Sequence, residues 1–183
     1  MDPVANLRTT AATMQQLLAG LEQDQLKLST PCAEWDVADL ADHVVANLLN
    51  SFAHWAGTDV AHEPCPIAAE LAARYRAAVQ VVLDTYTAPG VLDKTFSTPL
   101  GDAPGAMLLS VCFADQLTHV WDLSRALGVD VDVPDQLAED ALAVWGAFIS
   151  DPLRNGSTFA AAGDPGPGAP ALDRVAAFTG RTI

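Results

Sequence analysis

The chain has 183 residues, half of them hydrophobic, which is enough for one domain with a real core and excludes disorder as the default. Nine lysines and arginines stand against 23 aspartates and glutamates, and a net charge of −14 excludes nucleic acid and anionic membranes as expected partners. The apolar residues are mostly Ala, Leu and Val with few aromatics, a mixture that favours helices over strands.

The first half of the chain predicts three helices. Leucines recur at spacings of three and four over residues 6–25, and Pro31 prevents that helix from continuing. A second amphipathic pattern covers residues 37–55, with Asp36 as its N-cap. A third, rich in alanine, covers residues 67–86. All three patterns place apolar residues on one helical face.

The second half predicts two more long helices. Residues 91–104 form an extended segment or long loop, after which a helix is predicted over residues 105–127, with Gly128 as its C-cap. A fifth helix is predicted over residues 135–150.

The remaining residues predict a tail. Residues 160–170 form a Gly/Pro/Ala tract that is incompatible with a helix, and residues 172–178 form one short amphipathic helix. The sequence therefore predicts an all-α, single domain over residues 1–183. It consists of a four-helix bundle over residues 6–128, and a fifth helix with a packed tail over residues 134–183.

The first residues lack the basic and apolar regions of a secretory signal, and no stretch of about eighteen apolar residues occurs. The three cysteines, Cys32, Cys65 and Cys112, form no CxxC pair, which argues against disulfides and a structural zinc knuckle. These features predict a cytoplasmic protein without a membrane span.

One acid–histidine pair lies in the fourth predicted helix. Asp115 precedes His119 by one helical turn, and both border the apolar stripe that contains Leu108, Val111 and Cys112. A carboxylate and an imidazole in an apolar setting are costly unless they pair or bind a cation. The spacing therefore fits a metal site, and it equally fits a metal-free Asp–His hydrogen bond.

The other three histidines are less distinctive. His43 follows Asp39 by one turn, but it falls with Asn47 on the polar side of its helix, as a solvated histidine would. It could instead line a polar cavity at an open end of the bundle. His54 and His62 are expected at the surface, where either could also approach the mouth of a pocket.

Three segments resemble a known family. Residues 30–37 (TPCAEWDV), followed by Asp39, Leu40 and His43, resemble the TPC-x-x-W-x-V-x-D-L-x-x-H signature of actinobacterial DinB-like proteins. These proteins are grouped with the metal-binding domain of mycothiol-dependent maleylpyruvate isomerase. Residues 115–126 resemble a second signature of the group, and residues 172–181 resemble its short C-terminal helix.

The resemblance implies an antiparallel four-helix bundle of DinB-like topology. It also implies a divalent metal ion near one end of the bundle, held by His43, Asp115 and His119. Two histidines and one carboxylate suit Zn²⁺, and also Ni²⁺ and Fe²⁺. Asp39 and Asp122 are candidates for orienting the ring nitrogens of the ligands.

The sequence departs from the isomerase at two points. The isomerase has glutamate at the acidic ligand position, where this chain has the shorter Asp115. The isomerase also has a separate C-terminal domain, where this chain has residues 128–183. The shorter acid changes the reach of this ligand and its affinity for the metal, and the second difference argues against maleylpyruvate itself as the substrate.

The first functional hypothesis is a metal-dependent transferase or isomerase that uses a low-molecular-weight thiol such as mycothiol to attack a small electrophile. The second is a metal-binding module without turnover, acting in stress response, storage or partner assembly, and able to form a homodimer. The third is a metal-free helical scaffold.

Overall fold

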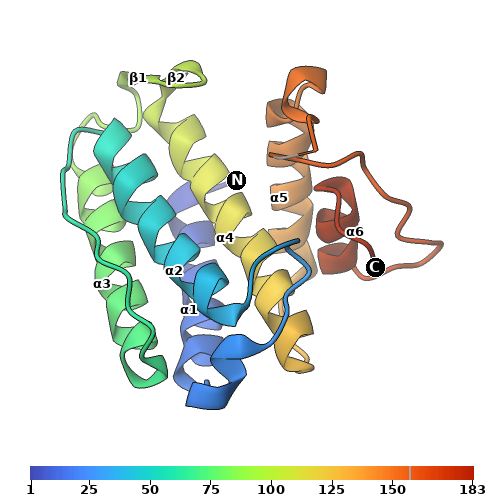
Figure 1. Cartoon of the computed structure of the whole chain (residues 1–183). Coiled ribbons are helices and arrows are strands. Elements are labelled where there is room, and N and C mark those ends of the chain that lie inside the picture. The colour runs from blue at the N-terminus through green and yellow to red at the C-terminus, as the bar shows by residue number, and fades with distance from the viewer. Residues whose placement is uncertain (157) are drawn as a thin grey trace.

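The computed structural model describes residues 1–156 and 158–183. Within this part the regular secondary structure is helical apart from one two-stranded hairpin and one isolated β-bridge, so the predicted all-α class is confirmed. Helix α1 packs against α3 and α4, and α2 also contacts both of these helices (Figure 1). The four bundle helices are α1 (Pro3–Ala19), α2 (Val37–Asn47), α3 (Ala68–Thr87) and α4 (Gly105–Leu127).

Helix α4 is the central element of the fold. Helices α1 and α2 contact one side of it, while α5 (Asp135–Phe148) and α6 (Ala171–Phe178) cover the other (Figure 1). Its residues are therefore buried almost all the way round, polar ones included. A polar side chain in the middle of α4 consequently needs a partner within the protein.

None of the described helices combines the length and the apolar character that a membrane-spanning helix requires.

The first helix is shorter than its leucine pattern predicts. Helix α1 ends at Ala19, because Gly20 closes it and residues 23–27 form a separate 3₁₀ helix, η1 (Gln23–Lys27). Glu22 caps η1 through a reciprocal pair of bonds with Gln25. The prediction to residue 25 was wrong because the later leucines stay buried in the core after the chain has left the helix.

The second predicted helix is continuous to Trp55 but irregular. Helix α2 passes into a π-helical segment, η2 (Leu48–Ala53), before the last helical residues. A π segment leaves backbone groups less regularly paired. Here the buried carbonyl of Phe52 accepts a 2.9 Å hydrogen bond from the hydroxyl of Tyr86. This irregular turn presents Phe52 and Trp55 next to each other, with ring centroids 5.5 Å apart.

The extended segment before α4 is a hairpin. Strand β1 (Thr95–Thr98) pairs antiparallel with β2 (Gly101–Pro104), and the hairpin lies at the end of the bundle where α4 begins (Figure 1). A Cβ at Gly105 would lie 2.2 Å from the carbonyl oxygen of Val91. Only glycine therefore allows α4 to begin so close to the preceding chain.

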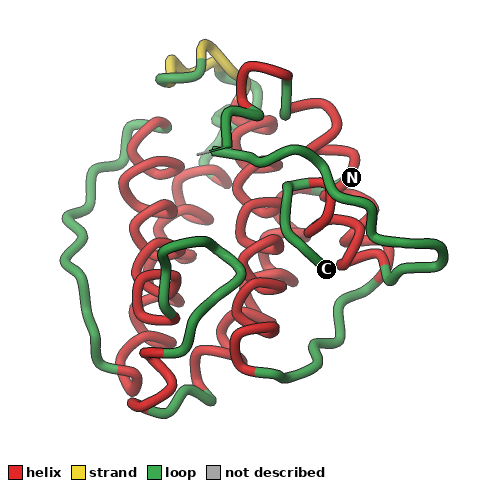
Figure 2. Tube along the Cα trace, turned by 45° about the vertical axis from the view of Figure 1, so that its right-hand side comes forward, coloured by secondary structure: helices red, strands yellow, loops and turns green. Residues whose placement is uncertain are grey.

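The tail returns to the bundle after a long excursion. Beyond the 3₁₀ helix η3 (Asp151–Leu153), the chain extends outward and comes back to α6 (Figure 2). The Arg154 guanidinium donates to the carbonyls of Ala160 and Phe178, and the Gly163 amide donates to Ala177. These bonds attach the tail to α6.

Candidate metal centre

Three polar side chains converge from α2 and α4. His43 lies in the middle of α2, and Asp115 and His119 lie one turn apart on α4. One ligand atom from each residue lies within 4.8 Å of the other two, and the two imidazole centroids are 4.9 Å apart. We call these three residues the His–Asp–His cluster.

The carboxylate of Asp115 is held by two amides. Its Oδ2 accepts a 2.9 Å hydrogen bond from Asn47 and a 3.3 Å bond from Gln116. Its Oδ1 lies 3.7 Å from Nε2 of His119. Asn47 was not predicted to belong to the site, although its place one turn after His43 on the same helical face was a usable signal. One oxygen of Asp115 is thus anchored while the other faces the histidines.

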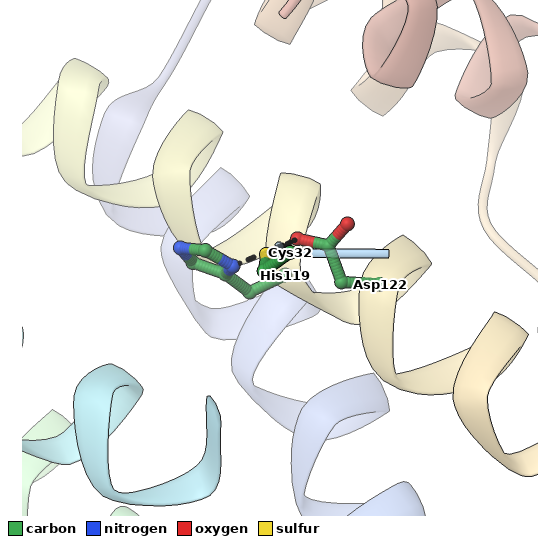
Figure 3. A group of neighbouring side chains, drawn as sticks. All are labelled: Cys32, His119 and Asp122. Atoms are coloured by element: carbon green, nitrogen blue, oxygen red, sulfur yellow. Dashed lines mark hydrogen bonds and ion pairs between the residues drawn. The ribbon is translucent and has the colours of Figure 1, made fainter. Parts of the chain in front are cut away.

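The second nitrogen of His119 contacts a buried aspartate. Nδ1 lies 2.9 Å from Oδ2 of Asp122, and the Cys32 thiol donates to the same oxygen at 3.2 Å (Figure 3). Asp122 also accepts two bonds from Arg181, at 3.1 Å from Nε and 2.8 Å from Nη2. Because Nδ1 is held on this side, Nε2 is oriented toward Asp115.

Arg181 is a site residue that sequence reasoning missed. It comes from the last residues of the chain, and its position depends on Gly180, whose φ is +95°. A Cβ at Gly180 would lie 2.7 Å from the Cβ of Ala160. No spacing in the sequence links residue 181 to residue 122, because the contact depends on how the tail folds back.

The loop that resembles the TPC signature covers the cluster. The Thr30 hydroxyl accepts a 3.1 Å bond from the Cys32 amide and lies 3.0 Å from the Trp35 carbonyl, to which it donates. Glu34 takes a left-handed conformation, φ 72°, inside this turn. The ring of Trp35 consequently lies 4.5 Å from that of His43, centroid to centroid.

Burial and charge act on the two imidazoles in different ways. Burial disfavours protonation of His119, but the carboxylates of Asp115 and Asp122 outweigh it and raise its pKa to about 10. Burial lowers the pKa of His43, and the neighbouring His119 lowers it further. Burial opposes ionisation of Asp122, yet hydrogen bonds from His119 and Arg181 hold its pKa well below the usual value.

Other predicted residues lie outside the cluster. Asp39 is exposed and accepts a 3.2 Å bond from the Asp36 amide, so it caps α2 and does not join the cluster. His54 is exposed, as expected, and pairs with a neighbouring exposed aspartate. The surface expectation for His62 was wrong, because its side chain is only 9% exposed and lies 2.9 Å from Asp42.

The donor set of the cluster fits a divalent cation. Two ligands that each lie about 2.0–2.1 Å from a tetrahedral zinc ion are separated by about 3.4 Å, close to the 3.7 Å between Asp115 and His119. A second group, Cys32, His119 and Asp122, is also compact, but the Arg181 guanidinium lies against it. A cation is therefore better accommodated in the His–Asp–His cluster.

A cavity of about 970 Å³ opens from the cluster. All three cluster residues line it, and so do Cys32 and Arg181. Its remaining surface is largely apolar. We use the name aromatic wall for five aromatic residues and one methionine of this lining, namely Phe52, Trp55, Met107, Trp145, Phe148 and Phe159.

The fold and site together define a helical-bundle protein with a His–Asp–His cluster in the wall of a large cavity. Residues 7–124 match the family model described as the mycothiol maleylpyruvate isomerase N-terminal domain, and the chain belongs to this family. Two proteins of Mycobacterium tuberculosis, from strains CDC 1551 / Oshkosh and H37Rv and both described as uncharacterised, are each 35% identical to this chain over 184 residues. Each match covers 100% of this chain and 100% of the relative.

A solved structure shares the fold. The crystal structure of a histidine-to-alanine mutant of mycothiol-dependent maleylpyruvate isomerase superposes with a TM-score of 0.59 at 15% identity. The match covers 75% of this chain and 65% of that chain, so this protein spans less than two thirds of the isomerase's length. At this identity the likeness establishes the fold alone.

Proposed function

We propose that this protein is a divalent-metal-dependent transferase or isomerase that joins a low-molecular-weight thiol, such as mycothiol, to a small electrophile. The observation that carries the proposal is the position of the His–Asp–His cluster, which lines a cavity large enough for substrates. Membership of the family named after a mycothiol enzyme supports the choice of thiol.

In this proposal His43 and His119 are neutral nitrogen ligands and Asp115 is the anionic ligand. Zinc is the first choice of metal, with nickel and iron as alternatives. Bound zinc supplies the positive charge that lowers the pKa of a thiol and so makes it a nucleophile near neutral pH. Asp122 orients His119, and Asn47 orients Asp115, so the donors are positioned before a ligand arrives.

The cavity accommodates both reactants, because about 970 Å³ is at the upper end of the usual range for ligand sites. In a transfer, the thiol proton passes to solvent and the sulfur electron pair forms the new bond to carbon. The leaving group departs with the electron pair of the bond that breaks. In an isomerisation, the thiol adds to a double bond and is later released unchanged. Addition converts the double bond to a single bond, and rotation about this bond precedes release of the thiol.

The first experiment is elemental analysis of protein purified without an affinity tag, for which we expect about one divalent ion per chain. The metal-loaded protein is then incubated with mycothiol and a panel of electrophiles, and thiol consumption is followed. His43→Ala and His119→Ala should abolish both metal retention and consumption. His62→Ala is the matched control, because it removes a partly buried, aspartate-paired histidine elsewhere.

The outcomes separate the alternatives. Metal retention without consumption of thiol across the panel would favour a non-catalytic metal-binding protein, such as one for storage or stress response. A chain that retains no metal, even after incubation with zinc, nickel or iron, would overturn the proposal and leave the metal-free scaffold.

A further inference from the structure

We infer that the electrophile is an uncharged molecule with an apolar body about the size of an aromatic ring system, and that the cavity disfavours carboxylate-bearing substrates. This inference rests on the proposed function and concerns the part of the cavity beyond the His–Asp–His cluster. It follows from the composition of the aromatic wall and from the charges that line the cavity.

The aromatic wall has two sides. Phe52 and Trp55 come from the end of the second helix, and Trp145, Phe148 and Phe159 come from α5 and the tail. These two elements flank α4 at the end nearest the hairpin (Figure 1).

The aromatic rings on the α5 side pack against one another. The ring of Trp145 lies 5.9 Å from that of Phe148 and 5.3 Å from that of Phe159, centroid to centroid. Trp145 is further held by a 3.1 Å bond from its indole nitrogen to Thr118 on α4. Such a surface binds an apolar group by removing both from water, and it offers such a ligand few polar partners.

In the described part of the chain, the one lysine or arginine that lines the cavity is already paired with a carboxylate. Among the described residues that line it, Arg181 is the only lysine or arginine, and Nε and Nη2 are both bound to Asp122. Both ring nitrogens of His119 likewise face carboxylates of the protein, Nε2 that of Asp115 at 3.7 Å and Nδ1 that of Asp122 at 2.9 Å.

The other charged lining residues are acidic. They are Glu34, Asp102 and Asp115. In the proposed reaction, the two positive charges of the ion are balanced by the Asp115 carboxylate and by the thiolate. A carboxylate substrate would therefore lose hydration without gaining an ionic partner, and this loss is costly in an apolar cavity.

The test compares two ligands of similar shape and different charge. 2-Naphthylmethanol is neutral, and naphthalene-2,3-dicarboxylate carries two negative charges. Equilibrium dialysis against the full chain, after chelator treatment and again with the metal-loaded protein saturated with mycothiol, should give at least about tenfold tighter binding of the neutral ligand in both samples. Equal or tighter binding of the dicarboxylate in either sample would overturn the inference.

A pair of variants locates the effect in the cavity. Met107→Lys places a cation on the aromatic wall at a side chain that is 41% exposed, so the lysine can keep its charge in water. Val129→Lys adds the same charge at a residue that is 44% exposed and outside the lining. Met107→Lys should reduce the ratio of the affinity for the neutral ligand to that for the dicarboxylate about threefold or more. Val129→Lys should leave this ratio unchanged. Equal behaviour of the two variants would contradict the assignment of the binding site.

Failure of this inference differs from failure of the proposed function. Probe affinity in the chelated sample depends on the cavity walls and not on metal or turnover. Metal content and thiol consumption are measured on separate samples. A protein that consumes mycothiol but binds the dicarboxylate tightly would retain the proposed function and reject this substrate class.

Discussion

Two regions of the molecule each contain a histidine 2.9 Å from an aspartate. In the loop after η2, His62 contacts Asp42 of α2, and in α4, His119 contacts Asp122. Only the second pair belongs to a compact group of ligand atoms among the described residues, because His119 also faces Asp115 and His43. A short His–Asp distance is therefore a weak indicator of a metal site. A better indicator of a metal site is that the other ring nitrogen, Nε2 of His119, faces a second carboxylate and a second histidine.

The two pairs also differ in what supports the aspartate. Asp122 is fully buried and receives two bonds from Arg181, whereas Asp42 is partly exposed. A buried carboxylate needs such partners to stay ionised. The Asp122 carboxylate thus holds His119 in a fixed orientation, whereas the contact between His62 and Asp42 attaches the loop to α2.

The largest expected effect distinguishes the two histidines directly. His119→Ala should weaken zinc affinity by more than about 100-fold, because it removes a ligand and not merely a residue that orients one. His62→Ala should change the affinity by less than about threefold. Competition with a chromophoric chelator measures both affinities. Equal losses of zinc affinity in the two variants would show that the pair of His119 and Asp122 is no closer to the metal site than the pair of His62 and Asp42.

The next effect concerns the support of Asp122. Arg181→Ala should weaken zinc affinity about 10- to 100-fold, the usual range for residues that orient a metal ligand. Arg181→Lys should restore part of the loss, since lysine keeps the charge but not the two-bond geometry. Arg174→Ala is the matched control, because Arg174 is another tail arginine and pairs with Glu139 on the surface. If Arg174→Ala weakened binding as strongly, net charge would explain the result.

A backbone change in the tail should have a smaller effect, measured as stability. Gly180→Ala requires an alanine at φ +95° and 2.7 Å from Ala160, so it should lower the free energy of unfolding by about 1–3 kcal/mol. Gly166→Ala has a similar φ of +81° but open space around it. Its cost should therefore be lower. Urea denaturation of both variants measures the difference, and identical midpoints would show that the contact with Ala160 is unimportant.

The smallest expected effect separates the two groups of ligand atoms that share His119. Cys32→Ser keeps a hydrogen-bond donor toward Asp122 and removes only the sulfur. Zinc affinity should stay within about threefold if the metal binds at the His–Asp–His cluster. A loss of about 100-fold or more would instead assign the metal to Cys32, His119 and Asp122. Chelator competition again provides the measurement.

The helices and two of the three residues of the His–Asp–His cluster were predictable from the sequence pattern alone. Spacings of three and four residues determine which faces are apolar, so the long helices were predictable to within a few residues, except where Gly20 ends α1. The same periodicity places Asp115 and His119 on one face of α4. His43 could be assigned only by resemblance, since its own helix pattern favoured solvent.

Only the tertiary structure decided which polar residues meet. Asp39 and Asn47 lie on the same side of α2, one turn before and one turn after His43, yet one caps the helix and the other holds Asp115. Arg181 reaches Asp122 because α6, which it follows directly, packs against α4. The aromatic wall forms because α5 and the end of the second helix flank α4. Helical periodicity is a local property of the chain, whereas these contacts join residues that are distant in sequence and depend on the packing of whole elements.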